Sequence, residues 1–319
     1  MKVLANDGIS KAGENALREG GIELLEHRVA QDHLINFINE NQVDVLLVRS
    51  ATKVRQVLID ACPSLKIIGR GGIGMDNIDV EYAIDKGLSV INTPSASSKS
   101  VAELVFAHFF ALARFLHESN RLMPLEGDTH FDAMKKSFSK AYELSGKTLG
   151  VIGFGGIGKE VVKMGISLGM KIKVYTRNIK TEKLSLSFFD GQEVSFEITS
   201  TNDMKDFLKD VEFLSINTPK SDGYIIDSPQ FAMMKDGIFI VNTARGGVIN
   251  EVTLLDQIES GKVAGAALDV FENEPKPELT LLMNPNLSLT PHLGGNTIDA
   301  QEKIGTELAE QIIEIKKKL

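Results

Sequence analysis

Gly150-Val-Ile-Gly153-Phe-Gly155-Gly-Ile-Gly158, near the middle of the 319-residue chain, matches the pattern G-x-G-x-x-G. Residues 147–153 are typical of a short buried strand, and the apolar spacing over 161–166 predicts a helix after the glycines. In this setting the glycines permit a tight turn, close approach of a pyrophosphate and packing of the helix on the strand. The helix N-terminus adds free N–H groups for phosphate oxygens. We therefore expect Gly153, Gly155 and Gly158 to bind a dinucleotide.

The bulk composition places the chain among globular proteins and bounds its partners. Its length suggests two domains, and 43% hydrophobic with 24% charged residues is the usual profile of a soluble protein. A formal net charge of −8 argues against a general nucleic-acid or anionic-membrane binder, and no apolar run is long enough to span a bilayer. Cys62 is the single cysteine and no signal peptide is apparent, so we expect a cytoplasmic protein.

Residues 1–98 alternate strand and helix patterns, which predicts a parallel sheet wrapped by helices. Two loops that follow its strands carry arginine beside small residues: Arg49 and Ser50 in the first, and Arg70 among glycines in the second. Loops after parallel strands lie at the carboxyl edge of the sheet, where open α/β sheets bind ligands. We therefore expect anion binding at Arg49, Ser50 and Arg70.

Three other segments are predicted from their patterns. Residues 97–117 read as one helix of about twenty residues, apolar nearly all round, which favours burial between domains or under the partner of a homodimer. Residues 184–198 read as a β-hairpin with an Asp190-Gly191 turn. A long amphipathic helix is expected from residue 296 to the end.

Six motifs in order resemble the D-isomer-specific 2-hydroxyacid dehydrogenases over nearly the whole chain. They are residues 49–54, 69–79 and 153–158, Asn242-Thr-Ala-Arg-Gly-Gly-Val-Ile249, Ala267-Leu-Asp-Val-Phe-Glu-Asn-Glu-Pro275 and Thr290-Pro-His-Leu-Gly-Gly295. The resemblance implies an α/β fold of two doubly wound parallel-sheet domains. A Rossmann dinucleotide-binding domain (99–290) would be inserted into a flavodoxin-like substrate domain (1–98 and 291–319).

The catalytic set implied by the resemblance is Arg245, Glu274 and His292. Oxidation of a secondary alcohol needs a base for the hydroxyl proton, and histidine titrates near working pH. Glu274 would bond the other imidazole nitrogen and fix its tautomer, as the acid does in other carboxylate–histidine pairs. Arg245 would hold the substrate carboxylate with its planar fork.

The same resemblance implies the remaining contacts, with no metal ion among them. The backbone of Ile73 and Gly74 would bind the substrate carboxylate, and Arg49 and Arg70 a more distant phosphate. Cofactor contacts beyond the three glycines are implied for Gly156, Ile157, Thr218, Pro219, Thr243, Ala244, Asp269 and Gly294, with Asp269 at the carboxamide.

For the substrate and the cofactor, the resemblance and the individual residues point in different directions. Within the family the phosphoglycerate dehydrogenases are most similar, which implies oxidation of D-3-phosphoglycerate with NAD in serine synthesis. The strand after the fingerprint helix ends in Thr176 and Arg177, without the acid that binds ribose hydroxyls, and these residues alone favour NADP. The alternatives are therefore an NADPH-dependent glyoxylate or hydroxypyruvate reductase, another D-2-hydroxyacid dehydrogenase, and a dinucleotide-sensing binding protein. Nothing follows Leu319 in the sequence, so we expect no serine-binding regulatory domain.

Overall fold

The computed structural model describes residues 1–318, which form two compact units. Unit 1 comprises Met1–Ser98 together with the C-terminal segment from Gly295, and unit 2 comprises Lys99–Gly294. The second boundary thus falls after Gly294 and not after residue 290, where the sequence placed it. As a result His292 belongs to unit 2, the same unit as Arg245 and Glu274.

Unit 1 is a five-stranded parallel sheet in the order β2-β1-β3-β4-β5, the flavodoxin-like order. Helices α2, α3 and α4 bury apolar side chains on one face, and α1 and α13 on the other. The elements are β1 (Lys2–Ala5), α1 (Lys11–Glu19), β2 (Glu23–Leu25), α2 (Leu34–Asn41), β3 (Val45–Val48), α3 (Gln56–Ala61), β4 (Ile67–Arg70), α4 (Val80–Asp85), β5 (Ser89–Asn92) and α13 (Ile298–Lys316).

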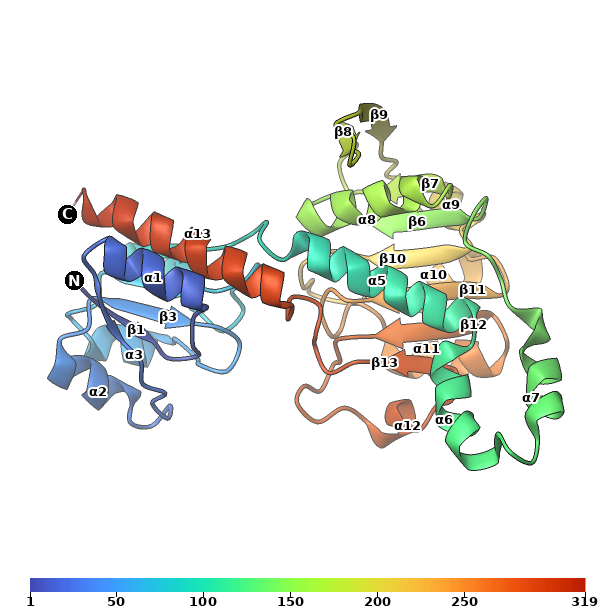
Figure 1. Cartoon of the computed structure of the whole chain (residues 1–319), viewed down its shortest axis with the longest axis horizontal. Coiled ribbons are helices and arrows are strands. Elements are labelled where there is room, and N and C mark those ends of the chain that lie inside the picture. Colours follow the sequence, from blue (N-terminus) through green and yellow to red (C-terminus); the bar gives the residue numbers. More distant parts are fainter. Residues whose placement is uncertain (319) are drawn as a thin grey trace. The chain divides into compact units, whose positions relative to one another are not determined.

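The two ends of the chain meet in unit 1, where α1 and α13 lie side by side (Figure 1). A β-carbon on Gly13 would lie only 2.7 Å from the α-carbon of Gly305. Glycine at both positions therefore lets the two helix backbones approach closely. This packing joins the last helix to the first strands of the chain in one domain.

Unit 2 is a six-stranded parallel sheet in the order β13-β12-β11-β10-β6-β7, with helices on both faces. Helices α5 and α8 cover one face, and α9 to α12 the other. The elements before the hairpin are α5 (Ser98–Ala113), α6 (Leu116–Glu126), α7 (Phe131–Ser137), η1 (Phe138–Lys140), β6 (Thr148–Ile152), α8 (Gly156–Ser167) and β7 (Lys171–Tyr175). Those after it are α9 (Met204–Leu208), β10 (Phe213–Ile216), α10 (Ser228–Met233), β11 (Ile238–Asn242), α11 (Glu251–Glu259), β12 (Val263–Leu268), α12 (Leu279–Leu282) and β13 (Leu287–Leu289).

The helix expected over residues 97–117 is wrong in its extent. It ends at Ala113, Phe115 takes a left-handed conformation (φ 54°), and a separate helix α6 begins at Leu116. No Gly or Pro marks the break in the sequence. The two helices differ in burial instead: α5 contributes Phe106 and Phe109 to the core, whereas α6 buries no side chain. Among the helices of residues 1–318 none alone is long and apolar enough to cross a membrane; the bent pair α5–α6 meets that test only when taken together.

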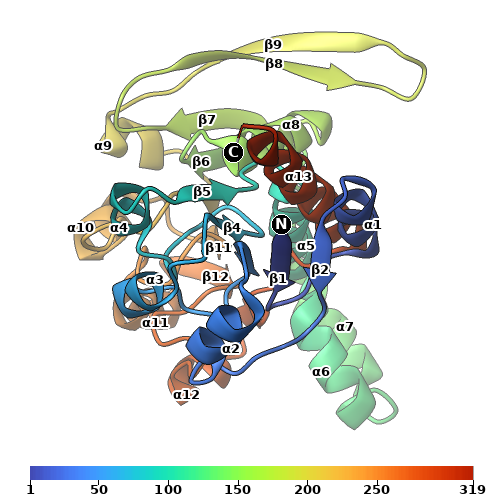
Figure 2. The same cartoon turned by 90° about the vertical axis from the view of Figure 1, so that its left-hand side faces the viewer.

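The expected β-hairpin is confirmed. Strands β8 (Thr181–Ser187) and β9 (Glu193–Thr199) pair antiparallel, and Gly191 in the turn has φ +83°. Figure 2 shows them as a long ribbon outside the six-stranded sheet.

Candidate active site

The glycine-rich turn of unit 2 lies where the strand order reverses, between β6 and β10. Gly153 has φ +94°, and a β-carbon there would lie 2.5 Å from the carbonyl oxygen of Asn217. A β-carbon on Gly158 would lie 2.1 Å from the carbonyl oxygen of Gly153, so these two glycines are required by packing. The space around Gly155 is open instead, as close approach of a pyrophosphate needs. Gly156 and Ile157 form the first turn of α8.

Unsatisfied polar atoms cluster at the neighbouring strand ends. Among the described residues the hydroxyls of Thr218 and Thr243 and the amide oxygen of Asn217 are buried without a hydrogen-bond partner. They directly follow β10 and β11, which are adjacent strands. Buried polar groups without partners are rare and ask for an explanation. The hydroxyls and carboxamide of a bound dinucleotide would supply the partners, so these residues fit that cofactor. Pro219 and the buried Ala244 directly follow the two threonines.

The residues after β7 offer hydroxyls and a cation. The Thr176 hydroxyl donates to the backbone oxygen of Asn178 (2.7 Å) and lies 2.5 Å from the hydroxyl of Ser200. Arg177 is exposed, and no described acidic side chain pairs with it. The end of this strand therefore lacks the carboxylate that accepts hydrogen bonds from ribose hydroxyls.

Arg245 sits on a turn that Asn242 shapes. The buried Asn242 side chain accepts from the N–H of Ala244 (3.0 Å) and donates to the carbonyl oxygen of Arg245 (3.0 Å). The Arg245 guanidinium donates to the carbonyl of Ala244 (2.7 Å). Its positive charge favours the deprotonated form of both Glu274 and His292, as the smallest of the influences on either pKa, and the net pKa of His292 is still raised.

His292 and Glu274 form a hydrogen-bonded pair. The Nδ1–H of His292 donates to Oε2 of Glu274 at 3.0 Å, and Oε1 of Glu274 accepts from the N–H of Phe271 at 3.0 Å. The hydrogen bond to Glu274 raises the pKa of His292 above its ordinary value, although burial opposes the rise. Burial would raise the pKa of Glu274, but the bonds from His292 and Phe271 bring it below its ordinary value. With Nδ1 engaged, Nε2 of His292 is the nitrogen that can exchange a proton with a substrate.

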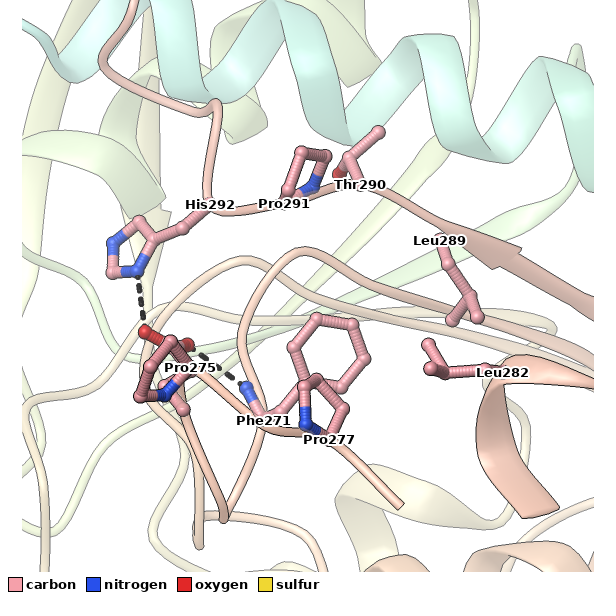
Figure 3. A pocket seen from close by; sticks show the side chains of 9 residues that line it. Phe271, Pro275, Pro277, Leu282, Leu289, Thr290, Pro291 and His292 are labelled. Carbon is pink, nitrogen blue, oxygen red and sulfur yellow. Dashed lines mark hydrogen bonds and ion pairs between the residues drawn. The ribbon is translucent and has the colours of Figure 1, made fainter. Parts of the chain in front are cut away.

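A pocket of about 400 Å³ lies against this pair (Figure 3). Thr290 adds one polar side chain, and the remaining walls are apolar: Phe271, Pro275, Pro277, Leu282, Leu289 and Pro291. In Figure 3 the His292 ring lies at one edge of the pocket, with Leu282 and Leu289 across from it.

Asp269 holds the loop around His292, in addition to the cofactor contact expected for it. It is 1% exposed, and its carboxylate accepts from the Thr290 hydroxyl (2.6 Å) and from the N–H groups of Leu293 (2.7 Å) and Gly294 (2.9 Å). These bonds fix the loop on both sides of His292, which has a left-handed backbone (φ 56°). Gly294 packs close to Asp269, where a β-carbon would lie 3.2 Å from Oδ2.

The expected anion ligands of unit 1 lie at one sheet edge. Arg70 ends β4 and pairs in register with Val48, the residue before Arg49, in β3. Asp7 holds the first loop by accepting from the N–H of Arg49 (2.7 Å), and exposed Ser50 follows. The Arg70 guanidinium lies over Gly72, where it would meet a β-carbon at 1.9 Å. The geometry thus brings Arg49 and Arg70 to neighbouring strand ends.

Ile73 and Gly74 continue the glycine-rich loop in unit 1. The side chain of Asn92 donates to the carbonyl oxygen of Ile73 (2.9 Å). No hydrogen bond from the N–H of Ile73 or Gly74 occurs within residues 1–318. No group of three or more His, Cys, Asp or Glu side chains among the described residues is arranged to hold a metal ion.

Sequence reasoning missed three residues that support the site: Asn242, Glu251 and His108. Asn242 stands inside a quoted motif, where an Asn at a strand end is a signal for a side-chain-stabilised turn. Glu251 begins α11, but its near-complete burial (7% exposed) has no signal in the helical pattern. His108 interrupts the apolar pattern of α5, and this interruption is the only feature of the sequence that indicates a special role for it.

Comparison with known proteins gives a consistent result. The sequence profile of the D-isomer specific 2-hydroxyacid dehydrogenase NAD-binding domain matches residues 106–294. The chain is 41% identical to hydroxypyruvate reductase of Thermotoga maritima, covering 98% of this chain and 97% of that protein. It is 39% identical to D-3-phosphoglycerate dehydrogenase of Methanocaldococcus jannaschii, covering 98% of this chain but only 57% of that longer protein.

A solved structure agrees with both relatives. The crystal structure of a glyoxylate reductase from Paecilomyes thermophila superposes with a TM-score of 0.78 at 30% identity, covering 98% of this chain and 95% of that one. The profile match covers more than half of the chain, and the T. maritima relative is matched nearly end to end. The chain has a dinucleotide fingerprint at the strand-order reversal and a histidine–glutamate pair in the same unit, and it belongs to the D-isomer-specific 2-hydroxyacid dehydrogenase family.

Proposed function

We propose that the protein interconverts a D-2-hydroxy acid and its 2-oxo acid by hydride transfer to and from a nicotinamide dinucleotide. The observation that carries the proposal is the His292–Glu274 pair, 3.0 Å apart, in the unit that also holds the glycine fingerprint and Arg245. When bound, the nicotinamide ring supplies the acceptor for the hydride of the C2–H bond. Gly153 to Gly158 and the threonines after β10 and β11 would hold the dinucleotide.

The protein's own part is proton transfer and orientation. In the oxidation direction Nε2 of neutral His292 takes the hydroxyl proton as the C2 hydride leaves, and the alcohol becomes a carbonyl. Glu274 keeps the proton of Nδ1 in place and stabilises the imidazolium that forms. Arg245 binds the carboxylate, and its charge polarises the C2 oxygen. In the reduction direction the imidazolium returns the proton.

D-3-phosphoglycerate is the substrate that unit 1 favours. It carries a carboxylate and a phosphate, and unit 1 offers Arg49 and Arg70 at adjacent strand ends with the N–H groups of Ile73 and Gly74 close by in the loop. An unphosphorylated hydroxy acid would use fewer of these donors. The product would be 3-phosphohydroxypyruvate, in serine synthesis, with NAD as the first-choice cofactor.

The second candidate is an NADPH-dependent reductase of hydroxypyruvate or glyoxylate. It is favoured by the end of β7, where Thr176 replaces an acid and exposed Arg177 can face a 2′-phosphate. The T. maritima relative named hydroxypyruvate reductase has nearly the same length as this chain, which also supports it.

We further propose a cytoplasmic homodimer. Helix α6 and the residues after it expose large apolar side chains, among them Leu116, Met123, Leu125 and Phe131. A second copy covering them would remove that surface from water. Light scattering coupled to size exclusion tests the dimer; a monomer at micromolar concentration would contradict it.

Steady-state rates separate these functions. We expect turnover of D-3-phosphoglycerate with NAD in the wild type, loss of it in His292→Ala, and no change in the control His33→Ala, whose ring is exposed. The panel is D-3-phosphoglycerate, D-glycerate and D-lactate with NAD and NADP, and hydroxypyruvate and glyoxylate with NADH and NADPH. Faster reduction of the last two with NADPH would favour the second candidate. Dinucleotide binding without turnover of any substrate would overturn the enzyme assignment.

A further inference from the structure

A buried histidine in unit 2 connects α5 to the loop that carries His292. His108 is 3% exposed, and its Nδ1 and Nε2 lie 3.0 Å from the Ser288 hydroxyl and 3.1 Å from the Thr290 hydroxyl. Both partners belong to the segment that leads from β13 to His292. A buried neutral imidazole between two hydroxyls makes both hydrogen bonds only if one ring nitrogen donates to its hydroxyl and the other accepts from its hydroxyl.

The direction of the hydrogen bonds follows from Asp269. Its carboxylate can only accept, so the Thr290 hydroxyl donates its one proton to Oδ1, 2.6 Å away. Thr290 must then accept from His108, which places a proton on Nε2. Burial lowers the pKa of His108 to about 4, so the ring is neutral at pH 7 and Nδ1 accepts from Ser288. The chain of donors therefore runs from Ser288 through His108 and Thr290 to Asp269.

The loop is held by these side-chain hydrogen bonds together with two backbone bonds, from the N–H of Thr290 to Leu268 and from the N–H of His292 to Thr290. Pro291, His292 and Leu293 are exposed, so apolar packing contributes little there. A left-handed backbone at a residue other than glycine costs about 1–2 kcal/mol, and His292 has φ 56°. Asp269 bonds the chain on both sides of that residue, at Thr290 before it and at the N–H groups of residues 293 and 294 after it.

We propose that His108 is a positioning residue for the general base: by orienting Thr290 toward Asp269, it holds the loop that places His292 against Glu274. The role of His292 as a base rests on the proposed function. Its position against Glu274 can be measured even in a protein without enzymatic activity.

NMR titration of the histidine rings tests the proposal directly. The chain has only six histidines, so each ring signal is assignable by substitution. His108→Phe removes the donor to Thr290, and we expect the pKa of His292 to fall toward the ordinary histidine value as contact with Glu274 loosens. In His108→Gln the amide N–H replaces Nε2–H, and the raised pKa of His292 should return. His33→Phe is the control, because that ring is exposed and its neighbour Asp32 is exposed as well.

A second variant tests the same hydrogen bond in case His108→Phe does not fold. Thr290→Val keeps the volume, removes the hydroxyl and should reproduce the effect of His108→Phe on His292. An unchanged pKa of His292 in a folded His108→Phe or Thr290→Val protein overturns the proposal. If the wild type is active, both variants should lose up to about 100-fold in kcat with little change in the dinucleotide KM. If the wild type is inactive, the proposed function fails and the titration still decides the positioning.

Discussion

The proton of Glu251 should make the stability of this protein depend on pH around neutrality. The carboxylate of Glu251 accepts from the N–H of Glu272 (2.8 Å), and Glu272 accepts in return from the N–H of Glu251 (3.1 Å). Burial raises the pKa of Glu251 from 4.5 to about 7, and the charges of Glu272 and Glu274 add to the rise. The Glu272 N–H bond opposes it only in part.

The sign and size follow from proton linkage. Because the folded state holds this proton more tightly than the unfolded chain, stability is greatest below pH 4.5 and falls as the pH rises to about 7. The two pKa values correspond to a loss of at most about 3 kcal/mol above neutrality. Glu251→Gln removes the ionisation and keeps an oxygen that accepts from the Glu272 N–H. We therefore expect equal stability at pH 5 and a gain of about 1–3 kcal/mol for the variant at pH 8.

Thermal unfolding at pH 5 and pH 8 measures this difference. A gain of 1 kcal/mol in a unit of this size corresponds to about 2–4 °C in Tm, and a comparison of midpoints avoids assuming that the two units unfold together. Glu259→Gln, on the exposed face of the same helix α11, is the control and should not change the pH dependence. If wild type and Glu251→Gln show the same shift of Tm between the two pH values, Glu251 does not hold the proton and our account of its environment is wrong.

Three further substitutions test the site. Glu274→Gln should move the acidic limb of the kcat/KM pH profile to lower pH, because His292 loses the charge that raises its pKa, and should lower the rate by about 10²–10⁴-fold; an unchanged limb would remove Glu274 from that role. Gly246→Ala should destabilise the protein by about 1–3 kcal/mol in urea unfolding, since the new β-carbon would lie 1.8 Å from the carbonyl oxygen of Phe271; wild-type stability would show that this contact yields. Arg177→Ala should raise the KM for NADPH by about tenfold and leave that for NADH unchanged, if Arg177 binds a 2′-phosphate; equal effects on both would exclude that contact.

The features that could be predicted from sequence are those set by local chemistry. Gly153, with φ +94°, takes a conformation that favours glycine, and the turn of the β8–β9 hairpin uses Gly191 in the same way. Alternating strand and helix patterns predict two parallel sheets because buried strands and amphipathic helices each leave their own period. The end of α5 could not be predicted, because the apolar pattern continues through Phe115 and Leu116, whereas burial in the core stops at Ala113.

The polar groups that hold the functional loops escaped prediction for a different reason. His292 stands on an exposed loop whose backbone is fixed by Asp269, 24 residues before Leu293 in the chain, and by His108, 182 residues before Thr290. Such contacts carry no periodicity, and a polar residue in an apolar stretch says only that a partner must exist. The precision of the site therefore comes from buried hydrogen bonds between distant segments, so substitutions that keep the apolar core but remove one donor should impair catalysis before they impair folding.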